Sequence, residues 1–260
     1  MKSVSHEKPW ILGSRTNLNA RLRLFCFPSA GGGATAYYSW VSALAPEIEV
    51  CPVQLPGREN RLGERPFLDF SQLMQALSTA LLPYLTRPFA FYGHSMGALI
   101  SYGLARQLRQ YHALMPEHLF ISSYRAPQIP NSETLHLLTD AELASKVLEM
   151  DGTDPALMKN SELRQLLLPI MRADFSVCES YVHTAGESLA CPITAFGGLQ
   201  DSRVSQAALE AWREQTRGMF TLHMMHGGHF FLRGMQQPLL QMISQELGRQ
   251  QSGKTLSTGV

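Results

Sequence analysis

Several features that define other protein classes are scarce or missing in this 260-residue sequence. Acidic and basic residues nearly balance, and a net charge of +1 leaves no basic surface for nucleic acid. No apolar run is long enough to span a membrane, and residues 1–8 lack the apolar core of a signal peptide. We therefore expect a cytoplasmic protein with no nucleic-acid or membrane partner.

Metal and disulfide motifs are missing as well. The cysteines Cys26, Cys51, Cys178 and Cys191 form no C-x-x-C pair, and no H-E-x-x-H occurs. This pattern predicts reduced, mostly buried thiols, no metal site and no cofactor.

The most informative motif is the G-x-S-x-G sequence at residues 93–97. It follows a short apolar and aromatic segment, 88–92, and precedes residues 98–108, whose apolar positions have helical spacing. A strand, a tight turn and a helix in this order are the context of a nucleophile elbow. We therefore predict that Ser95 is a nucleophile.

A serine nucleophile needs a base and an acid that orients the base. On a fold with this elbow they follow in the order Ser, Asp or Glu, His, each after a strand. Asp201 follows the expected strand 192–196, and His229 follows the expected strand 219–225. The order predicts a triad of Ser95, Asp201 and His229.

Other histidines and carboxylates compete for these roles. His226 is a weaker candidate for the base, because the two glycines after it suit a turn that presents His229. His223 lies within a strand and His94 within the elbow, so we expect structural roles for these two. The strand expected at 119–123 is followed by no carboxylate, which favours Asp201 as the acid. Asp174 is a candidate for an ion pair. The carboxylates expected to be solvated or to cap helices are Asp140, Asp151 and Asp154.

Hydrolysis of an acyl group passes through an oxyanion that backbone N–H groups must stabilise. Met96 follows the nucleophile and supplies one such group. The expected strand 21–27 is followed by a glycine-rich loop, 28–33, in which Ala30 supplies the second. The loop contains neither G-x-G-x-x-G nor a Lys-Ser/Thr pair, which disfavours a phosphate-binding loop.

Segments along almost the whole chain resemble the type II thioesterases, the stand-alone partners of polyketide synthases and nonribosomal peptide synthetases. Beside the elbow, they are Phe-Pro-Ser-Ala-Gly-Gly at 27–32, Gln-Leu-Pro-Gly-Arg-Glu at 54–59, Arg-Ala-Asp-Phe at 172–175 and Gly-His-Phe-Phe at 228–231. The chain departs from the family at Ser29, where a larger His or Tyr is common. The family triad falls on Ser95, Asp201 and His229, in agreement with the order argument.

The resemblance implies hydrolysis of acyl or aminoacyl thioesters on the phosphopantetheine arm of a carrier protein of a modular synthase. The triad itself does not separate a thioesterase from a small-molecule carboxylesterase or lipase. A catalytically dead hydrolase fold that binds a ligand is the third hypothesis, and the intact triad argues against it. We expect the enzyme to be a monomer.

Strand and helix segments alternate, which predicts one α/β domain with a parallel sheet and helices on both faces. Together with the resemblance, this alternation implies the α/β-hydrolase fold, with a single domain at 1–248. The family places a helical lid between the strands near Ile121 and Ile193, and residues 138–181 fit it, with helices at 141–148 and 161–168 and Gly152 and Pro155 between them. We expect the apolar side chains of this lid to face partly the active-site pocket and partly the core, among them Leu143, Leu148, Leu163 and Leu167. Residues 249–260 are polar and are expected to form a disordered tail.

Overall fold

The computed structural model describes residues 9–13, 17, 19–150 and 159–255, with side chains described as far as residue 249. Asp151, Gly152, Asp154 and Pro155, which entered the sequence analysis, lie outside the described residues.

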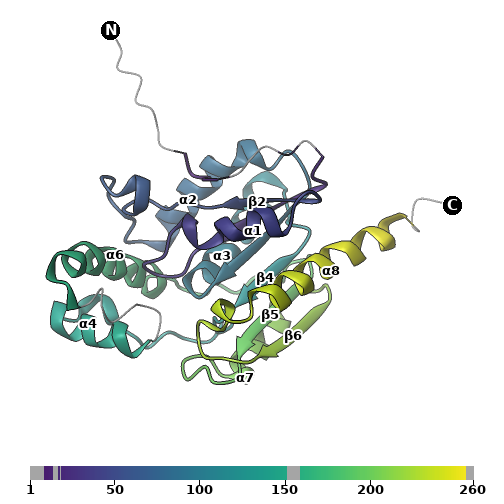
Figure 1. The fold of residues 1–260 in the computed structure, drawn as a ribbon. Helices are drawn as coiled ribbons and strands as arrows, with labels where there is room; N and C mark the ends of the chain where they lie inside the picture. Colours follow the sequence, from purple (N-terminus) through teal and green to yellow (C-terminus); the bar gives the residue numbers. More distant parts are fainter. Residues whose placement is uncertain (1–8, 14–16, 18, 151–158, 256–260) are drawn as a thin grey trace, which may run out of the picture.

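A six-stranded sheet runs through the centre of the protein, and all of its neighbouring strands pair in parallel (Figure 1). The strand order is β2-β1-β3-β4-β5-β6, so the chain first builds toward one edge and then toward the other. The strand bounds are β1 Leu22–Phe27, β2 Ile48–Pro52, β3 Phe89–His94, β4 Leu119–Ser122, β5 Ile193–Gly198 and β6 Phe220–Met225.

Successive side chains of a strand point to opposite faces, and both faces of this sheet are buried. In β1, Phe25 and Phe27 pack with α2 Phe70–Leu81 and α3 Met96–His112. Leu24 and Cys26 pack on the other face, with α1 Tyr38–Ala43 and α8 Gln236–Thr255. The predicted parallel sheet with helices on both faces is confirmed.

Local sequence explains several helix starts. Asp69 caps α2 by accepting a hydrogen bond from the N–H of Gln72, and Thr139 and Glu142 form a capping box at α4 Asp140–Glu149. Asn160 caps α6 Ser161–Glu179. The remaining short helices are η1 Ala34–Tyr37, η2 Glu59–Arg61, η3 Leu82–Tyr84, η4 Leu135–Leu137, α7 Gln206–Glu210, η5 Ala211–Gln215 and η6 Phe231–Arg233.

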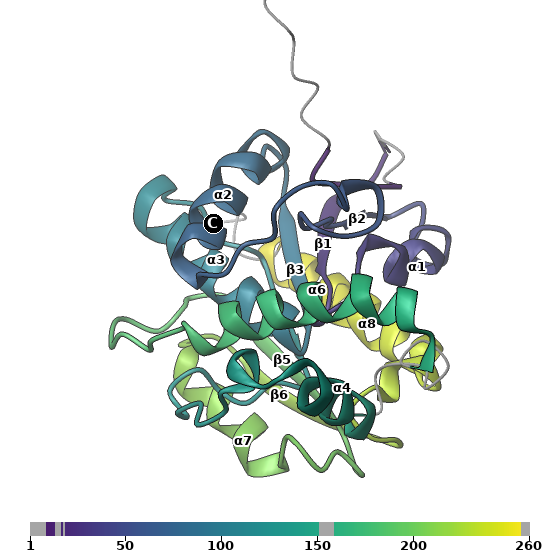
Figure 2. The ribbon, with the colours of Figure 1, turned by 90° about the vertical axis from the view of Figure 1, so that its left-hand side faces the viewer.

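The segment between β4 and β5 forms the helical cap that the family resemblance implied. Helices α4 and α6 pack on each other and on η4 at one end of the molecule (Figures 1 and 2). Their apolar side chains form a separate cluster that includes Leu143, Val147 and Phe175. The second cap helix is longer than predicted, because it continues through Pro169 to Glu179 rather than ending near 168.

The C-terminal boundary was also predicted wrongly. Residues 249–255, expected in a disordered tail, form the last turns of α8. Extending an existing helix costs far less than starting one, so polar residues such as Gln250 and Gln251 continue it. Residues 256–260 lie outside the described part.

All four cysteines are free and buried, in agreement with the prediction of reduced, mostly buried thiols. Cys26 and Cys51 lie in β1 and β2, Cys178 lies in α6, and Cys191 lies just before β5. Over the described ranges, no helix is both long and apolar enough to cross a membrane.

Candidate active site

Ser95 lies in a strained turn between β3 and α3. Its φ of +54° and ψ of −119° are rarely adopted by a residue with a side chain. The flanking glycines allow the backbone segments to close: a Cβ on Gly93 would lie 2.0 Å from the carbonyl oxygen of Gly97, and one on Gly97 would lie 2.1 Å from that of Phe27. The sequence therefore folds into the elbow only with glycine on both sides.

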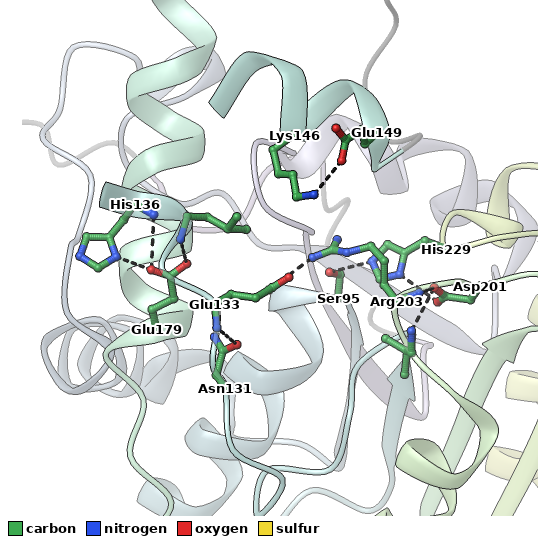
Figure 3. Close-up of polar contacts among 12 residues, drawn as sticks. Ser95, Asn131, Glu133, His136, Lys146, Glu149, Glu179, Asp201, Arg203 and His229 are labelled. Atoms are coloured by element: carbon green, nitrogen blue, oxygen red, sulfur yellow. Dashed lines mark hydrogen bonds and ion pairs between the residues drawn. The ribbon is translucent and has the colours of Figure 1, made fainter. Parts of the chain in front are cut away.

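The structure brings the three predicted side chains into one hydrogen-bonded series (Figure 3). Nε2 of His229 lies 3.0 Å from Oγ of Ser95, and Nδ1 of His229 lies 2.9 Å from Oδ2 of Asp201. They come from three separate β-to-α connections, after β3, β5 and β6. In a parallel sheet such connections meet at the carboxyl edge, which brings residues 134 positions apart together.

The carboxylate of Asp201 is fully buried and held by its own turn. Its Oδ1 accepts hydrogen bonds from the N–H groups of Arg203 and Val204, at 2.9 and 3.2 Å. Burial alone raises the pKa of Asp201, but the hydrogen bond and charge of His229 and the two backbone N–H groups outweigh it and lower the pKa below its ordinary value. The carboxylate is thus ionised where it faces the imidazole.

Two glycine turns bring Asp201 and His229 together. A Cβ on Gly198 would lie 2.2 Å from the carbonyl oxygen of Gly228, so the turns after β5 and β6 touch through their backbones. Gly227 has a φ of +117°, which a residue with a side chain rarely adopts. Gln200 joins the turns further, because its Oε1 accepts a hydrogen bond from the N–H of Gly227 at 2.6 Å.

The competing histidines lie in other surroundings. His226 is exposed and does not line the cavity described below. His223 lies in the edge strand β6 and stacks on Phe196 of β5. His94 is buried beside His229, with ring centroids 5.5 Å apart, and its Nδ1 is 2.9 Å from Oγ of Ser122. Burial, then the nearby His229 and Arg233, lower the pKa of His94 well below its ordinary value, so this ring is neutral.

The two predicted oxyanion donors also line the cavity with Ser95. Met96 begins α3, so its N–H belongs to the unsatisfied first turn of a helix. Ala30 lies in the glycine loop after β1. Within the described residues, neither N–H donates to a turn or loop acceptor.

Asp174 forms the ion pair for which the sequence made it a candidate, and its partner is Arg58. Both side chains are buried, and both guanidinium nitrogens lie 2.7 Å from the carboxylate oxygens. The same carboxylate accepts a hydrogen bond from the N–H of Gly31 at 2.7 Å. The segment after β2 and helix α6 thus meet at the glycine loop.

A cavity of about 1180 Å³ lies between the triad and the cap. Ser95 and His229 form part of its wall, and α4 and α6 contribute apolar side chains. These cap residues are Val147, Met150, Leu167, Met171 and Phe175. The volume exceeds that of most small-ligand sites, and its walls combine apolar and charged groups.

Two of the four cap leucines singled out from the sequence lie as expected, and two do not. Of the four leucines expected to face the cavity or the core, only Leu167 lines the cavity, while Leu143 is fully buried in the cap cluster. Leu148 and Leu163 are 39% and 42% exposed. The helical register that decides this was not fixed by apolar spacing alone, because α6 is apolar around much of its circumference.

Charged residues at the cavity were not predicted from the sequence. Figure 3 shows Arg203, two positions after Asp201, pointing toward Glu133, which lies between β4 and the cap helices. Nη2 of Arg203 lies 3.7 Å from Oε2 of Glu133. Glu179 on α6 pairs with the ring of His136 and accepts from the N–H of Leu135. No motif or spacing in the sequence identifies these charged residues as part of the site. Among the described residues, no cluster of three His, Cys, Asp or Glu side chains has the arrangement of a metal site.

Comparisons with known proteins match the chain to one family. The sequence profile of the Thioesterase domain matches residues 22–247. The chain is 44% identical to the gramicidin S biosynthesis protein GrsT of Aneurinibacillus migulanus over 248 residues, which cover 95% of this chain and 97% of GrsT.

Two solved structures are similar over nearly their full length. The type II thioesterase BorB of the borrelidin biosynthetic cluster aligns with a TM-score of 0.85 and 36% identity, covering 94% of this chain and 99% of BorB. RedJ, the thioesterase of the prodiginine pathway in Streptomyces coelicolor, aligns with a TM-score of 0.83 and 40% identity, covering 87% of this chain and 91% of RedJ.

Proposed function

The chain belongs to the thioesterase family, and from this premise we propose that it hydrolyses acyl or aminoacyl thioesters on the phosphopantetheine arm of a carrier protein. The matches to GrsT, BorB and RedJ confirm the resemblance to type II thioesterases and support a role in nonribosomal peptide or polyketide synthesis, in editing or release. The observation that carries the catalytic part of the proposal is the hydrogen-bonded series of Ser95, His229 and Asp201.

In the proposed mechanism, the first half-reaction forms an acyl-enzyme. Nε2 of His229 takes the proton of Ser95 Oγ, and the oxygen attacks the thioester carbon. The negative charge on the carbonyl oxygen receives hydrogen bonds from the N–H groups of Ala30 and Met96. Asp201 holds the imidazole in the required tautomer and stabilises its positive charge. The C–S bond then breaks, and the thiol leaves with the proton from His229.

The second half-reaction is the reverse with water as the nucleophile. His229 removes a proton from water, the resulting hydroxide attacks the acyl carbon, and the proton returns to Ser95 Oγ as the C–O bond breaks. The products are the free acid and the regenerated serine. Only the side chains of this chain are needed for the proton transfers.

The cavity supports a substrate with a long thioester arm rather than a small ester. Its volume of about 1180 Å³ accommodates an acyl group together with an extended thiol arm. The apolar cap residues suit the acyl part, and the charged residues, Arg203 and Glu133 among them, suit the polar arm.

The decisive experiment compares three substrates and one variant. We expect kcat/KM to be highest with an acyl-loaded carrier protein, lower with acyl-CoA and lowest with a p-nitrophenyl ester. Ser95→Ala should lower turnover by about 10³-fold or more, and mass spectrometry after a fluorophosphonate should find the adduct on Ser95.

Ser101→Ala is the matched control. This buried hydroxyl donates within α3 to the carbonyl of Gly97 at 2.7 Å, and its removal should leave turnover within about twofold. A preference for the p-nitrophenyl ester would identify a carboxylesterase instead. Failure of all substrates and of labelling would leave a binding protein with a hydrolase fold.

A further inference from the structure

The glycine loop that carries Ala30 is held by buried side chains from two distant segments. Gly31 donates its N–H to Oδ2 of Asp174 at 2.7 Å, and Nη1 of Arg58 donates to the carbonyl oxygen of Gly32 at 3.1 Å. Arg58 and Asp174 are joined by two hydrogen bonds of 2.7 Å. One planar ion pair therefore binds the backbone on both sides of the Gly31–Gly32 peptide.

The same loop also contacts the cap helix closely. Gly31 has a φ of +72°, and a Cβ there would lie 2.2 Å from Sδ of Met171, one turn before Asp174 on α6. The loop thus lies against α6, with the side chain of Met171 filling the space beside Gly31. Its position and the position of α6 are coupled through the backbone of a single residue.

An ion pair is an inefficient way to stabilise a core. Side chains of Arg58 and Asp174 are 4% and 3% exposed, and removing two charges from water costs about as much as their attraction returns. An apolar pair of the same volume would stabilise the fold as well or better. What an apolar pair does not supply is a fixed acceptor for the Gly31 N–H and a fixed donor for the Gly32 carbonyl.

A catalytic oxyanion site has the opposite requirement from a flexible glycine loop. Its donors must be in place before charge develops, because reorganising them during the reaction raises the barrier. Three consecutive glycines, Gly31 to Gly33, have the largest backbone freedom of any residues. Some external contact has to remove that freedom beside Ala30.

We propose that Arg58 and Asp174 form a positioning pair that fixes the oxyanion loop and couples it to the cap helix α6. The pair acts through Gly31 and Gly32 on the adjacent N–H of Ala30, and it does not touch the substrate. This inference rests on the proposed function, because it assumes that Ala30 is an oxyanion donor. It also implies that the Asp174 end of α6 stays fixed when the cap admits substrate.

The test replaces both charges together by apolar side chains, as Arg58→Met with Asp174→Leu. The double variant keeps the volume buried and leaves no unpaired charge, so it should fold, as checked by its thermal midpoint. We expect kcat on an acyl thioester to fall by about 10- to 100-fold, less than or similar to the loss of a whole oxyanion donor, with KM within about twofold.

A second readout separates positioning from general damage. The Ser95 oxygen adds to the carbonyl carbon of an alkyl trifluoromethyl ketone, the hydroxyl proton passes to Nε2 of His229, and the former carbonyl oxygen becomes an oxyanion in the same site. Its inhibition constant should weaken by the same factor as kcat/KM falls, because both depend on the transition-state charge. Arg58→Lys, which keeps the charge pair but not the planar fork, should retain intermediate activity and intermediate affinity.

Arg172→Met is the matched control on the same helix. Arg172 also forms an ion pair, with Asp140 at 2.7 Å, and donates to the carbonyl of Leu138, but it does not contact the glycine loop. Its kcat and inhibitor affinity should stay within about twofold of the parent protein.

The outcomes distinguish this inference from the proposed function. If Ser95→Ala abolishes turnover while the folded double variant keeps parental kcat and inhibitor affinity, the positioning role is wrong and the proposed function stands. If Ser95→Ala stays active, the proposed function itself fails. Should the double variant not fold, Arg58→Lys decides: parental kcat and affinity in that folded variant would overturn the inference.

Discussion

Replacing Gly198 by alanine should separate the two turns that carry Asp201 and His229. The new Cβ would lie 2.2 Å from the carbonyl oxygen of Gly228 and 2.4 Å from that of Gly227. Both are backbone atoms, and the turn that carries them is also held by the hydrogen bond to Gln200. The clash therefore cannot be relieved by moving a flexible side chain. An ordinary contact needs about 3.5 Å, and the turns must therefore part by more than about 1 Å.

The size of the effect follows from the triad distances. The distance from Nδ1 of His229 to Oδ2 of Asp201 is 2.9 Å. An added 1 Å lengthens this distance to about 4 Å, which is beyond hydrogen-bond range. A misplacement of this size costs about 10²-fold in rate, which corresponds to about 2.7 kcal/mol of transition-state stabilisation. We expect kcat to carry most of the loss, because neither Gly198 nor Asp201 is among the residues that line the cavity.

Gly228→Ala is a control one residue before His229. Its new Cβ would lie 3.7 Å from the carbonyl oxygen of Gln200, an ordinary contact. Release of the thiol from an acyl thioester, followed with a chromogenic disulfide, gives kcat and KM for both variants, and circular dichroism gives their thermal midpoints. Equal kcat/KM for the Gly198 and Gly228 variants, both folded, would refute the reasoning.

Three further predictions concern the same site. His229→Ala should lower kcat by several orders of magnitude, whereas His226→Ala, at an exposed position, should leave it nearly unchanged; the reverse result would mean that the base is His226. The lowered pKa of Asp201 means that its ionised form stabilises the fold above its ordinary pKa and that this stability is lost as pH falls through the lowered value. Chemical denaturation should therefore show a smaller loss of stability from about pH 5 to about pH 2 for Asp201→Asn than for the parent, and equal losses would contradict the assignment. Leu167→Ala should shift acyl-length preference, because Leu167 lines the cavity, while Leu163→Ala should not; equal preference profiles would show that α6 does not shape the acyl site.

The sequence predicted which three side chains the fold brings together, because each of them follows a local rule. An elbow needs glycine on both sides of Ser95, and the order of strand ends selected Asp201 and His229. These constraints act within a few residues and can be recognised from the sequence alone. Their convergence required only the parallel sheet that the strand and helix alternation predicted.

The parts that were missed depend on contacts between distant segments. Neither β2 nor α2 was predicted, and the second cap helix was expected to end near 168, although Pro169 lies inside α6. A proline can be accommodated there because tertiary packing of the helix outweighs one lost hydrogen bond. Asp174 was singled out for an ion pair, but its partner Arg58 lies 116 positions away, and no spacing rule connects them.

The burial of the four cysteines has a consequence for a protein that produces a free thiol in every turnover. Disulfide exchange needs a thiolate, and burial raises the pKa of Cys26 and Cys178 well above the ordinary value and that of Cys191 to about 12. Because Cys178 lies in the wall of the cavity, its protonated state matters most there. We expect the thiol product to leave the protein without forming a mixed disulfide, even under oxidising conditions.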